Sequence, residues 1–193
     1  MKKIVFVCFI LMMGFCDSFA QSMKITANGF IDANDVSKKY IVLNLPNISK
    51  ERLFIETIKY INANYPRPEE ITNVLENEQI VITGHDWVKV GLGILDGGGD
   101  VDAQYCYKYD LQFRDGKIRL EPIFDCIKYG SSTIVSLIGK KSFGSPTSGL
   151  FNEKGKVISG REVEIVDQQI NSFIYSLEKK SRRLPVRTGN CFT

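Results

Sequence analysis

The single histidine of the chain stands in a triplet whose side chains could carry out chemistry, His85-Asp86-Trp87. An imidazole beside a carboxylate can bind a ligand or transfer a proton near neutral pH. Spacing ties no serine or cysteine to His85 as a nucleophile, so the sequence does not predict a catalytic triad. The pattern favours a turn at the start of a strand, with an exposed imidazole.

Acidic residues gather around a glycine run and beside a predicted strand. They are Asp96, Asp100, Asp102, Glu69, Glu70, Glu76 and Glu78. The aspartates lack the residue order and the final glutamate of an EF-hand loop, which argues against a calcium site. The glutamates could act as acids or bases, but acids beside a solvated loop are the commoner arrangement. Gly91 and Gly93 open no helix, so they do not predict a phosphate site.

The five cysteines do not form a recognisable metal or redox motif. Cys8 and Cys16 lie in residues 1–20, which are predicted below to be a signal peptide that is removed on export. The exported chain then keeps Cys106, Cys126 and Cys191. Three cysteines in an oxidising compartment allow at most one bridge within the chain. A Cys-x-x-Cys pair is absent, and one histidine cannot complete a common zinc site. The sequence therefore predicts no metal, no cofactor and no catalytic residue.

Residues 1–20 have the layout of a secretory signal peptide. Lys2 and Lys3 precede an apolar run, and Ser18 and Ala20 supply the small residues before a cleavage point. We expect cleavage after Ala20 and a periplasmic or secreted product. The alternative is a lipoprotein acylated at Cys16, but a phenylalanine precedes this cysteine where such sites need a small residue. After cleavage, the sequence predicts no integral membrane segment.

Length and composition indicate one globular domain. The chain has 193 residues, of which 44% are hydrophobic and 24% are charged. This balance is typical of folded proteins and is too apolar for a disordered chain. A formal net charge of +3 is too small to indicate nucleic acid or an anionic membrane as a partner.

The first predicted elements are a strand and a helix. Residues 39–45 alternate between apolar and polar side chains, which indicates a half-buried strand. Ser49 is a suitable N-cap for an amphipathic helix over Lys50–Asn64, which Pro66 ends. Two further strands are predicted over 79–83, ended by Gly84, and over 87–95. Gly97, Gly98 and Gly99 then form a hairpin connection.

The next hairpin can be placed in register. Asp115-Gly116 favours a two-residue type I′ turn with Arg114 opposite Lys117. This register brings two apolar sets to one face: Tyr105, Tyr107, Tyr109, Leu111 and Phe113 on one strand, and Ile118, Leu120, Phe124 and Cys126 on the other. Cys126 is then expected opposite Tyr105, while Cys106 points to the other face. We therefore predict that both cysteines are free thiols, because a bridge between them would need a bulge.

Three segments complete the predicted organisation. Residues 21–37 are an N-terminal leader for which the sequence predicts no defined element, and 38–181 form a single α+β domain. Within this domain, 129–159 is a long insertion rich in glycine and serine. Ser159 and Glu162 predict a capping box at the start of a long amphipathic helix. Residues 182–193 are predicted to be a C-terminal tail.

The chain resembles an uncharacterised family of exported domains from Gram-negative gut bacteria, described as having a TATA-binding-protein-like fold. The residues that carry the resemblance are 47–53, 76–84 and 109–119. It covers roughly residues 38–127 and the last helix, and the insertion departs from the pattern. The resemblance implies a curved antiparallel sheet of about five strands with two helices on one face, in the order β-α-β-β-β-β-α. It implies no activity and no DNA binding, because function depends on sites rather than folds.

The sheet face opposite the helices is the candidate binding surface. By alternation it carries Tyr40, Val42, Val81, Trp87, Lys89 and Cys106. Exposed aromatic and branched residues on an open sheet suggest a partner surface, unless the insertion folds back over it. The leading hypothesis is a non-catalytic binding or accessory domain of the cell envelope, whose partner is an unidentified envelope protein or glycan. The alternatives are a periplasmic hydrolase acting on glycans or peptides, and a structural homo-oligomer whose number of subunits the sequence does not give.

Overall fold

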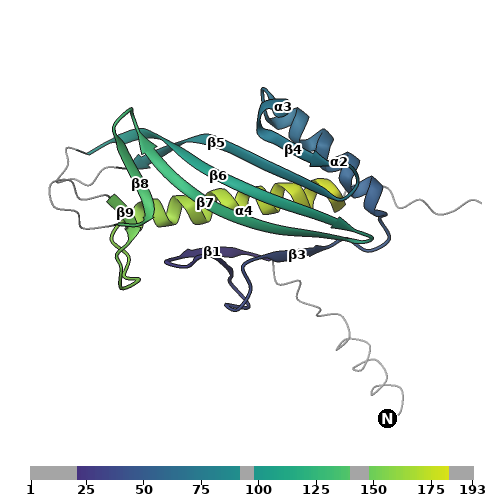
Figure 1. Ribbon diagram of the computed structural model, residues 1–193, viewed down its shortest axis with the longest axis horizontal. Helices are drawn as coiled ribbons and strands as arrows, with labels where there is room; N and C mark the ends of the chain where they lie inside the picture. The colour runs from purple at the N-terminus through teal and green to yellow at the C-terminus, as the bar shows by residue number, and fades with distance from the viewer. Residues whose placement is uncertain (1–20, 92–97, 140–147, 183–193) are drawn as a thin grey trace, which may run out of the picture.

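The computed structural model describes residues 21–91, 98–139 and 148–182, and in this part of the chain one twisted sheet dominates (Figure 1). The sheet has seven strands. Six of them follow one another in the order β4-β5-β6-β7-β8-β9, and the seventh, β3, pairs with residues 117–120 of β7. The strands are β3 (Ile41–Asn44), β4 (Thr72–Leu75), β5 (Gln79–Gly91), β6 (Asp100–Arg114), β7 (Lys117–Tyr129), β8 (Thr133–Ile138) and β9 (Ser148–Phe151). All neighbours are antiparallel except β8 and β9, which are parallel.

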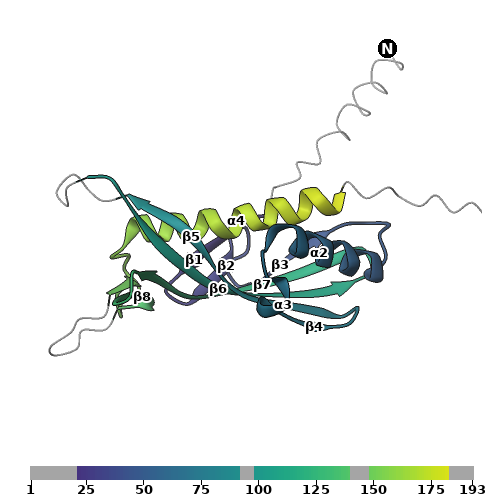
Figure 2. The ribbon, with the colours of Figure 1, turned by 90° about the horizontal axis from the view of Figure 1, so that it is seen from above.

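Two helices, α2 (Lys50–Asn64) and α4 (Gly160–Arg182), lie on the same side of this sheet (Figure 2). A single helical turn, α3 (Pro68–Ile71), precedes β4. The predicted fold class, α+β with two helices on one face of a largely antiparallel sheet, is confirmed. The sheet has seven strands where five were expected: the insertion adds β8 and β9, residues 72–75 add β4, and two of the predicted strands are joined in β5.

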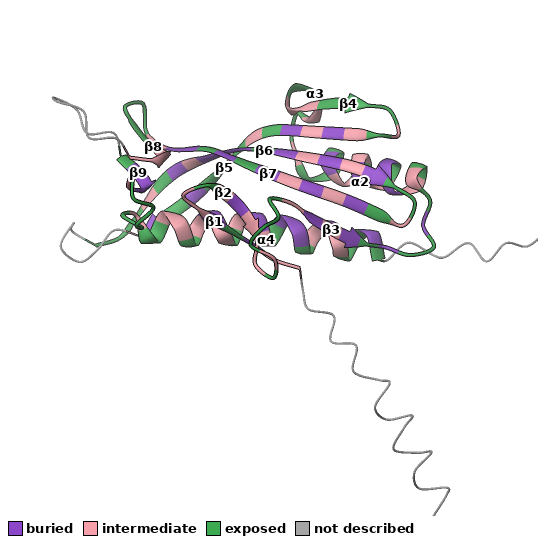
Figure 3. Ribbon diagram, turned by 60° about the horizontal axis from the view of Figure 1, so that its bottom comes forward, coloured by how far each residue is buried: buried purple, intermediate pink, exposed green. Residues whose placement is uncertain are grey.

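Burial alternates along the central strands, which defines an inner face toward the helices and an outer face (Figure 3). The predicted inner side chains of β6 are all buried: Tyr105, Tyr107, Tyr109, Leu111 and Phe113. Helix α4 buries Val166, Ile170, Phe173, Ile174 and Leu177 against them. Burial of each such side chain contributes about 1.5–3 kcal/mol. The alternation read from the sequence therefore places the core correctly.

The β6–β7 turn has the predicted register, but the far end of this hairpin does not. Arg114 pairs with Lys117, as expected. Gly116 has a positive φ of 69° but Asp115 does not have a positive φ, so the turn is not of the predicted type I′. A bulge then follows, because the pairing shifts by one residue beside Asp125. Ile127, rather than Cys126, therefore lies opposite Tyr105, and the predicted inner position of Cys126 is wrong.

The two strands predicted on either side of Gly84 are one continuous strand, β5. Gly84 does not end the strand because its missing side chain leaves room for Tyr107 on β6. A Cβ atom at Gly84 would lie 3.3 Å from the hydroxyl oxygen of Tyr107. The glycine therefore serves close packing within the sheet instead of a turn.

Residues 21–37, the predicted leader, contain a two-stranded hairpin of β1 (Met23–Thr26) and β2 (Gly29–Asp32). Met23, Ile25 and Phe30 are buried in the core. The side chain of Asn171 on α4 accepts a hydrogen bond from the Met23 N–H and donates one to the Met23 carbonyl, each 2.9 Å long. The segment is thus part of the packed domain.

The insertion at 129–159 extends the sheet and does not cover the outer face in its described part. Val135, Leu150 and Phe151 are buried in the core, whereas Ile134 is exposed. Helix α4 begins at the predicted place but without the capping box. The Ser159 hydroxyl donates to the Gly149 carbonyl over 3.0 Å, and the Glu162 carboxylate accepts from Tyr129 over 2.8 Å.

Candidate functional site

The predicted outer-face residues share one face of the sheet but fall into two groups. Cross-strand pairing places Val81 in line with Asp110 and Glu121, near β3, where Tyr40 and Val42 lie. Trp87 lies six residues further along β5 and is followed by Lys89. At about 3.3 Å per residue, the two groups are roughly 20 Å apart. The face therefore offers two separate surfaces instead of one.

The group near β3 is polar and already paired with its neighbours. The guanidinium of Arg119 lies 4.1 Å from the centre of the Tyr40 ring, a cation–π contact. Arg119 also forms an ion pair with Glu121 over 2.7 Å. Tyr40, Val42 and Val81 are each only half-exposed. Because Tyr40 already contacts Arg119 and none of the three side chains is fully exposed, this group is the weaker candidate for a contact surface.

The second group forms an apolar surface that we call the Trp87 patch, consisting of Trp87, Ile123, Ile134, Cys106 and Cys126. Trp87 is 68% exposed, Ile123 48% and Ile134 53%. Pairing aligns Trp87 with Gln104, Lys128 and Ile134 across four strands, and Ile123 lies two rows away. Sequence alternation found Trp87 but missed Ile123 and Ile134. Ile123 lies on the outer face in the predicted register of the β6–β7 hairpin, whereas Ile134 lies on β8, a strand that the sequence did not predict.

Cys106 and Cys126 lie directly opposite each other on the outer face, between the rows of Ile123 and Trp87. Both are buried and both are free thiols in the structure. Burial, and then a hydrogen bond with the Cys106 thiol, raise the pKa of Cys126 to about 12. Because Cys106 and Cys126 are cross-strand partners on the outer face, the expectation that their side chains point to opposite faces is wrong.

The triplet His85-Asp86-Trp87 lies in the middle of β5 rather than in a turn. His85 and Trp87 are exposed on the outer face, whereas Asp86 points to the inner face among the helices. Because a strand sends successive side chains to opposite faces, His85 and Asp86 cannot act on one substrate. This separation removes the triplet as a proton-transfer site.

Asp86 lines a small polar pocket between the sheet and both helices, with a volume of about 160 Å³. The other lining residues are Tyr60, Tyr65, Tyr109, Gln169, Ser172, Phe173 and Ser176. Burial raises the pKa of Asp86, and a hydrogen bond from Tyr107 opposes this shift. The Tyr107 hydroxyl oxygen also lies 3.2 Å from the Tyr65 hydroxyl oxygen, within hydrogen-bond distance. The sequence signal for this pocket was an aspartate at an inner position of β5, between Gly84 and Val88.

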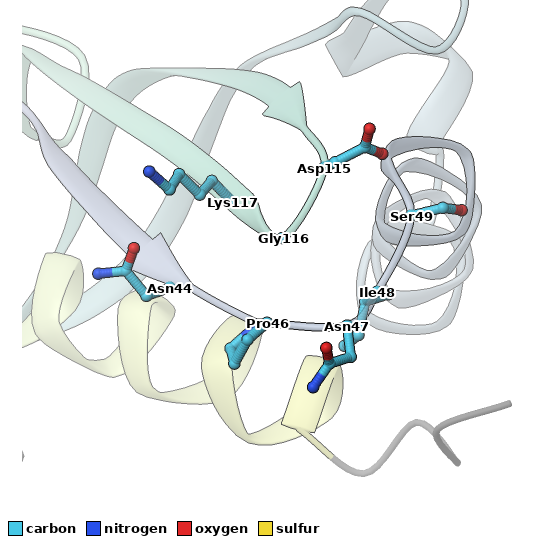
Figure 4. Close-up of a pocket in the computed structure, with 8 residues that line it drawn as sticks. All are labelled: Asn44, Pro46, Asn47, Ile48, Ser49, Asp115, Gly116 and Lys117. Carbon is cyan, nitrogen blue, oxygen red and sulfur yellow. The ribbon is translucent and has the colours of Figure 1, made fainter. Parts of the chain in front are cut away.

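A larger cavity of about 660 Å³ lies between the β6–β7 turn and the loop that leads into α2 (Figure 4). The loop and the turn are joined by backbone hydrogen bonds from Gly116 N–H to Ile48 and from Leu45 N–H to Gly116, 2.8 and 2.7 Å long. Asp115 accepts a hydrogen bond from the Lys50 N–H over 2.9 Å, at the first turn of α2. Two of the segments that carry the family resemblance meet here, and their contacts hold the fold together.

The remaining acidic candidates do not converge. Glu69, Glu70, Glu76, Glu78, Asp100 and Asp102 are all exposed, while Asp96 and Gly93 lie outside the described residues. Within residues 21–91, 98–139 and 148–182, no group of three histidine, cysteine or acidic side chains is placed to hold a metal ion. Among the helices described, none combines the length and apolar character needed to cross a membrane.

The fold defines a TATA-binding-protein-like α+β domain, and comparison with solved structures bears this out. A DUF4468 family protein from Bacteroides ovatus matches 78% of this chain and 88% of its own, with 10% identity and a TM-score of 0.51. A TBP-like protein from Parabacteroides distasonis matches 76% and 92%, with 12% identity and a TM-score of 0.52. At such identities the likeness extends to the fold alone. The sequence itself matches no protein-family profile and no curated protein.

Proposed function

We propose that this protein is a non-catalytic binding domain of the bacterial cell envelope that contacts a protein or glycan partner through the Trp87 patch. The observation that carries the proposal is the exposure of the only tryptophan, at 68%, on the same face of the sheet as the exposed side chains of Ile123 and Ile134. Burying each of these side chains in an interface would contribute about 1.5–3 kcal/mol. Tryptophan is also enriched among the residues that dominate binding energy.

The polar surroundings of the patch suit the rim of an interface. Lys89, Lys108 and Asp102 lie around it at the neighbouring outer-face positions, and Lys128 lies in the row between Trp87 and Ile134. A surface with an apolar centre and charged edges matches the usual anatomy of a transient interface. The charges on this face have both signs, which favours a protein or glycan over nucleic acid as the partner.

A hydrolase is the less favoured alternative because its carboxylates are not paired. Glycan hydrolysis uses two carboxyl groups roughly 5–10 Å apart on either side of the bond that is cleaved. The pocket at Asp86 has a single carboxyl group among its lining residues, and three tyrosines surround it. A structural homo-oligomer would use the Trp87 patch itself, so the experiment below separates it from a heterologous partner.

The proposal includes export, with removal of residues 1–20. It is supported by the position of the first described strand, which begins at Met23, directly after the expected cleavage point. Intact-mass measurement of the protein from an envelope fraction tests this. A mass that begins at Gln21 supports the proposal, and a lipid-modified mass that begins at Cys16 contradicts it.

Affinity capture from envelope extracts tests the binding role. The wild-type chain is compared with Trp87→Ala and with the control Tyr175→Ala, which removes an aromatic side chain that is 62% exposed on α4. We expect Trp87→Ala to lose a partner that wild type and Tyr175→Ala both retain. Equal recovery by all three proteins would remove the Trp87 patch as the contact surface. Self-association that only Trp87→Ala abolishes, measured by sedimentation, would indicate a homo-oligomer instead.

A further inference from the structure

The strongest unassigned feature is the pair of cysteines in the centre of the outer face. Cys106 on β6 and Cys126 on β7 are cross-strand partners in an antiparallel ladder, and each is no more than 7% exposed. The bulge beside Asp125 creates this arrangement. Without the extra residue, Cys126 would point to the inner face and Cys106 to the outer face.

Directly opposed positions in an antiparallel pair have the separation that a disulfide needs. Their Cα atoms lie about 4.5–5.5 Å apart, within the range of about 4.4–6.8 Å found for bridged cysteines. Both side chains project from the same face of the ladder, because the bulge puts the two cysteines in one cross-strand pair. A bridge therefore requires side-chain rotation and little movement of either strand.

We propose that Cys106 and Cys126 are a disulfide site, oxidised by exchange with the disulfide of a small thiol or of a thiol–disulfide oxidoreductase. This inference does not depend on the binding role of the Trp87 patch. The bridge links β6 and β7 at the bulge, where the regular ladder is interrupted. It also holds the floor of the Trp87 patch in a fixed position.

The exchange proceeds in two balanced steps when oxidised glutathione is the oxidant. The Cys106 thiolate attacks one glutathione sulfur, forms a mixed disulfide and releases one glutathione thiolate. Cys126 then attacks the Cys106 sulfur, releases the second glutathione and passes its proton to a released thiolate. Two electrons move from the protein to glutathione, so one disulfide is consumed and one is formed. The reverse order, in which Cys126 attacks first, gives the same product with the same electron balance.

Non-reducing peptide mapping tests the site. The full chain is purified in reductant, equilibrated with reduced and oxidised glutathione, quenched with acid, alkylated and digested with trypsin. Cleavage after Lys89, Lys108, Arg119 and Lys128 places the two cysteines in separate peptides, 90–108 and 120–128. We expect these peptides to be recovered as one disulfide-linked pair. We also expect Cys106→Ser and Cys126→Ser to carry a glutathione adduct on the remaining cysteine.

A second measurement reports on the fold. Oxidation should raise the Tm of the wild-type chain by roughly 5–10 °C, since a single bridge stabilises a domain of this size by a few kcal/mol. Reductant or either serine substitution should abolish this shift. If the folded chain does not react, it is unfolded and refolded in the same glutathione mixture. Recovery of both cysteines as alkylated thiols, as separate glutathione adducts, or in a bridge to Cys191 would overturn the proposal.

Discussion

The two faces of the sheet have different relations to the rest of the chain. The inner face carries a ladder of three buried tyrosines, with Tyr105 and Tyr107 rings 5.2 Å apart and Tyr107 and Tyr109 rings 4.3 Å apart. The outer face carries charged residues and the Trp87 patch, and no described helix packs on it. Inner side chains are therefore fixed by packing within the chain, whereas several outer side chains, such as that of Trp87, are exposed to solvent. The predictions below test this division.

High pH should unfold the protein through the inner face. Burial raises the pKa of Tyr105, Tyr107 and Tyr109 above the ordinary value near 10. These groups stay protonated in the folded state while the unfolded chain ionises, so stability present below about pH 10 is lost as the pH rises further. For three such groups, the free energy of unfolding falls by about 4 kcal/mol for each pH unit. Far-UV circular dichroism and tyrosinate absorbance should change together, and tyrosinate formation by all eight tyrosines before unfolding would contradict this.

Removing an apolar side chain should cost far more on the inner face than on the outer face. Leu111 is fully buried, so Leu111→Ala should reduce the free energy of unfolding by about 2–5 kcal/mol. Ile123, 48% exposed, is the matched control, and Ile123→Ala should change it by less than about 0.5 kcal/mol. Urea unfolding measures both. Similar costs for the two variants would show that the outer face is covered.

Gly84→Ala should destabilise the protein by about 1–3 kcal/mol through overpacking. The new methyl group would press on the Tyr107 hydroxyl, which is held by its hydrogen bond to Tyr65. Tyr107→Phe removes the obstructing oxygen and serves as the background for a double-mutant cycle. The cost of Gly84→Ala should shrink in that background, and an unchanged cost would place the strain elsewhere.

Asp86→Asn should give the smallest effect, a modest stabilisation at neutral pH. Burial raises the pKa of Asp86 in the folded state, so ionisation above pH 4 or so favours the unfolded chain. Asparagine avoids this cost and still accepts the hydrogen bond from Tyr107. Urea unfolding should give the variant a higher free energy of unfolding than wild type at pH 7 and the same value as wild type below about pH 4. A gain that persists at low pH would rule out ionisation as its cause.

The sequence predicted the elements whose signals are local. Helix α2 begins after its Ser49 cap and covers the predicted residues, and the Asp115-Gly116 turn sets the register of β6 and β7. Features that depend on partners distant in sequence were missed. Gly84 signals a break unless Tyr107 is known to lie beside it. The bulge left one local trace, the adjacent apolar residues Cys126 and Ile127, which interrupt strict alternation.

The prediction of the candidate site likewise succeeded where the signal was local and failed where it depended on residues distant in sequence. Trp87 was placed on the outer face because its neighbours on β5 alternate, even though β5 was predicted as two strands. The insertion was considered as a possible cover for that face, and Ile134 within it lies instead on β8, which pairs with β7 and extends the sheet. Strand pairing between distant segments decides which exposed residues become neighbours, and the sequence of one chain gives no direct signal of that pairing.

The bonds between β1 and α4 connect residues about 150 positions apart in the chain. Ile25 N–H donates to the Asp167 carboxylate over 2.7 Å, next to the paired bonds between Met23 and Asn171. Because the backbone of β1 bonds to side chains of the last helix, this part of the core cannot close until residues 160–182 have been synthesised. Until then the apolar side chains of Met23, Ile25 and Phe30 lack their final packing partners, so completion of the core is set by the end of the domain and not by its beginning.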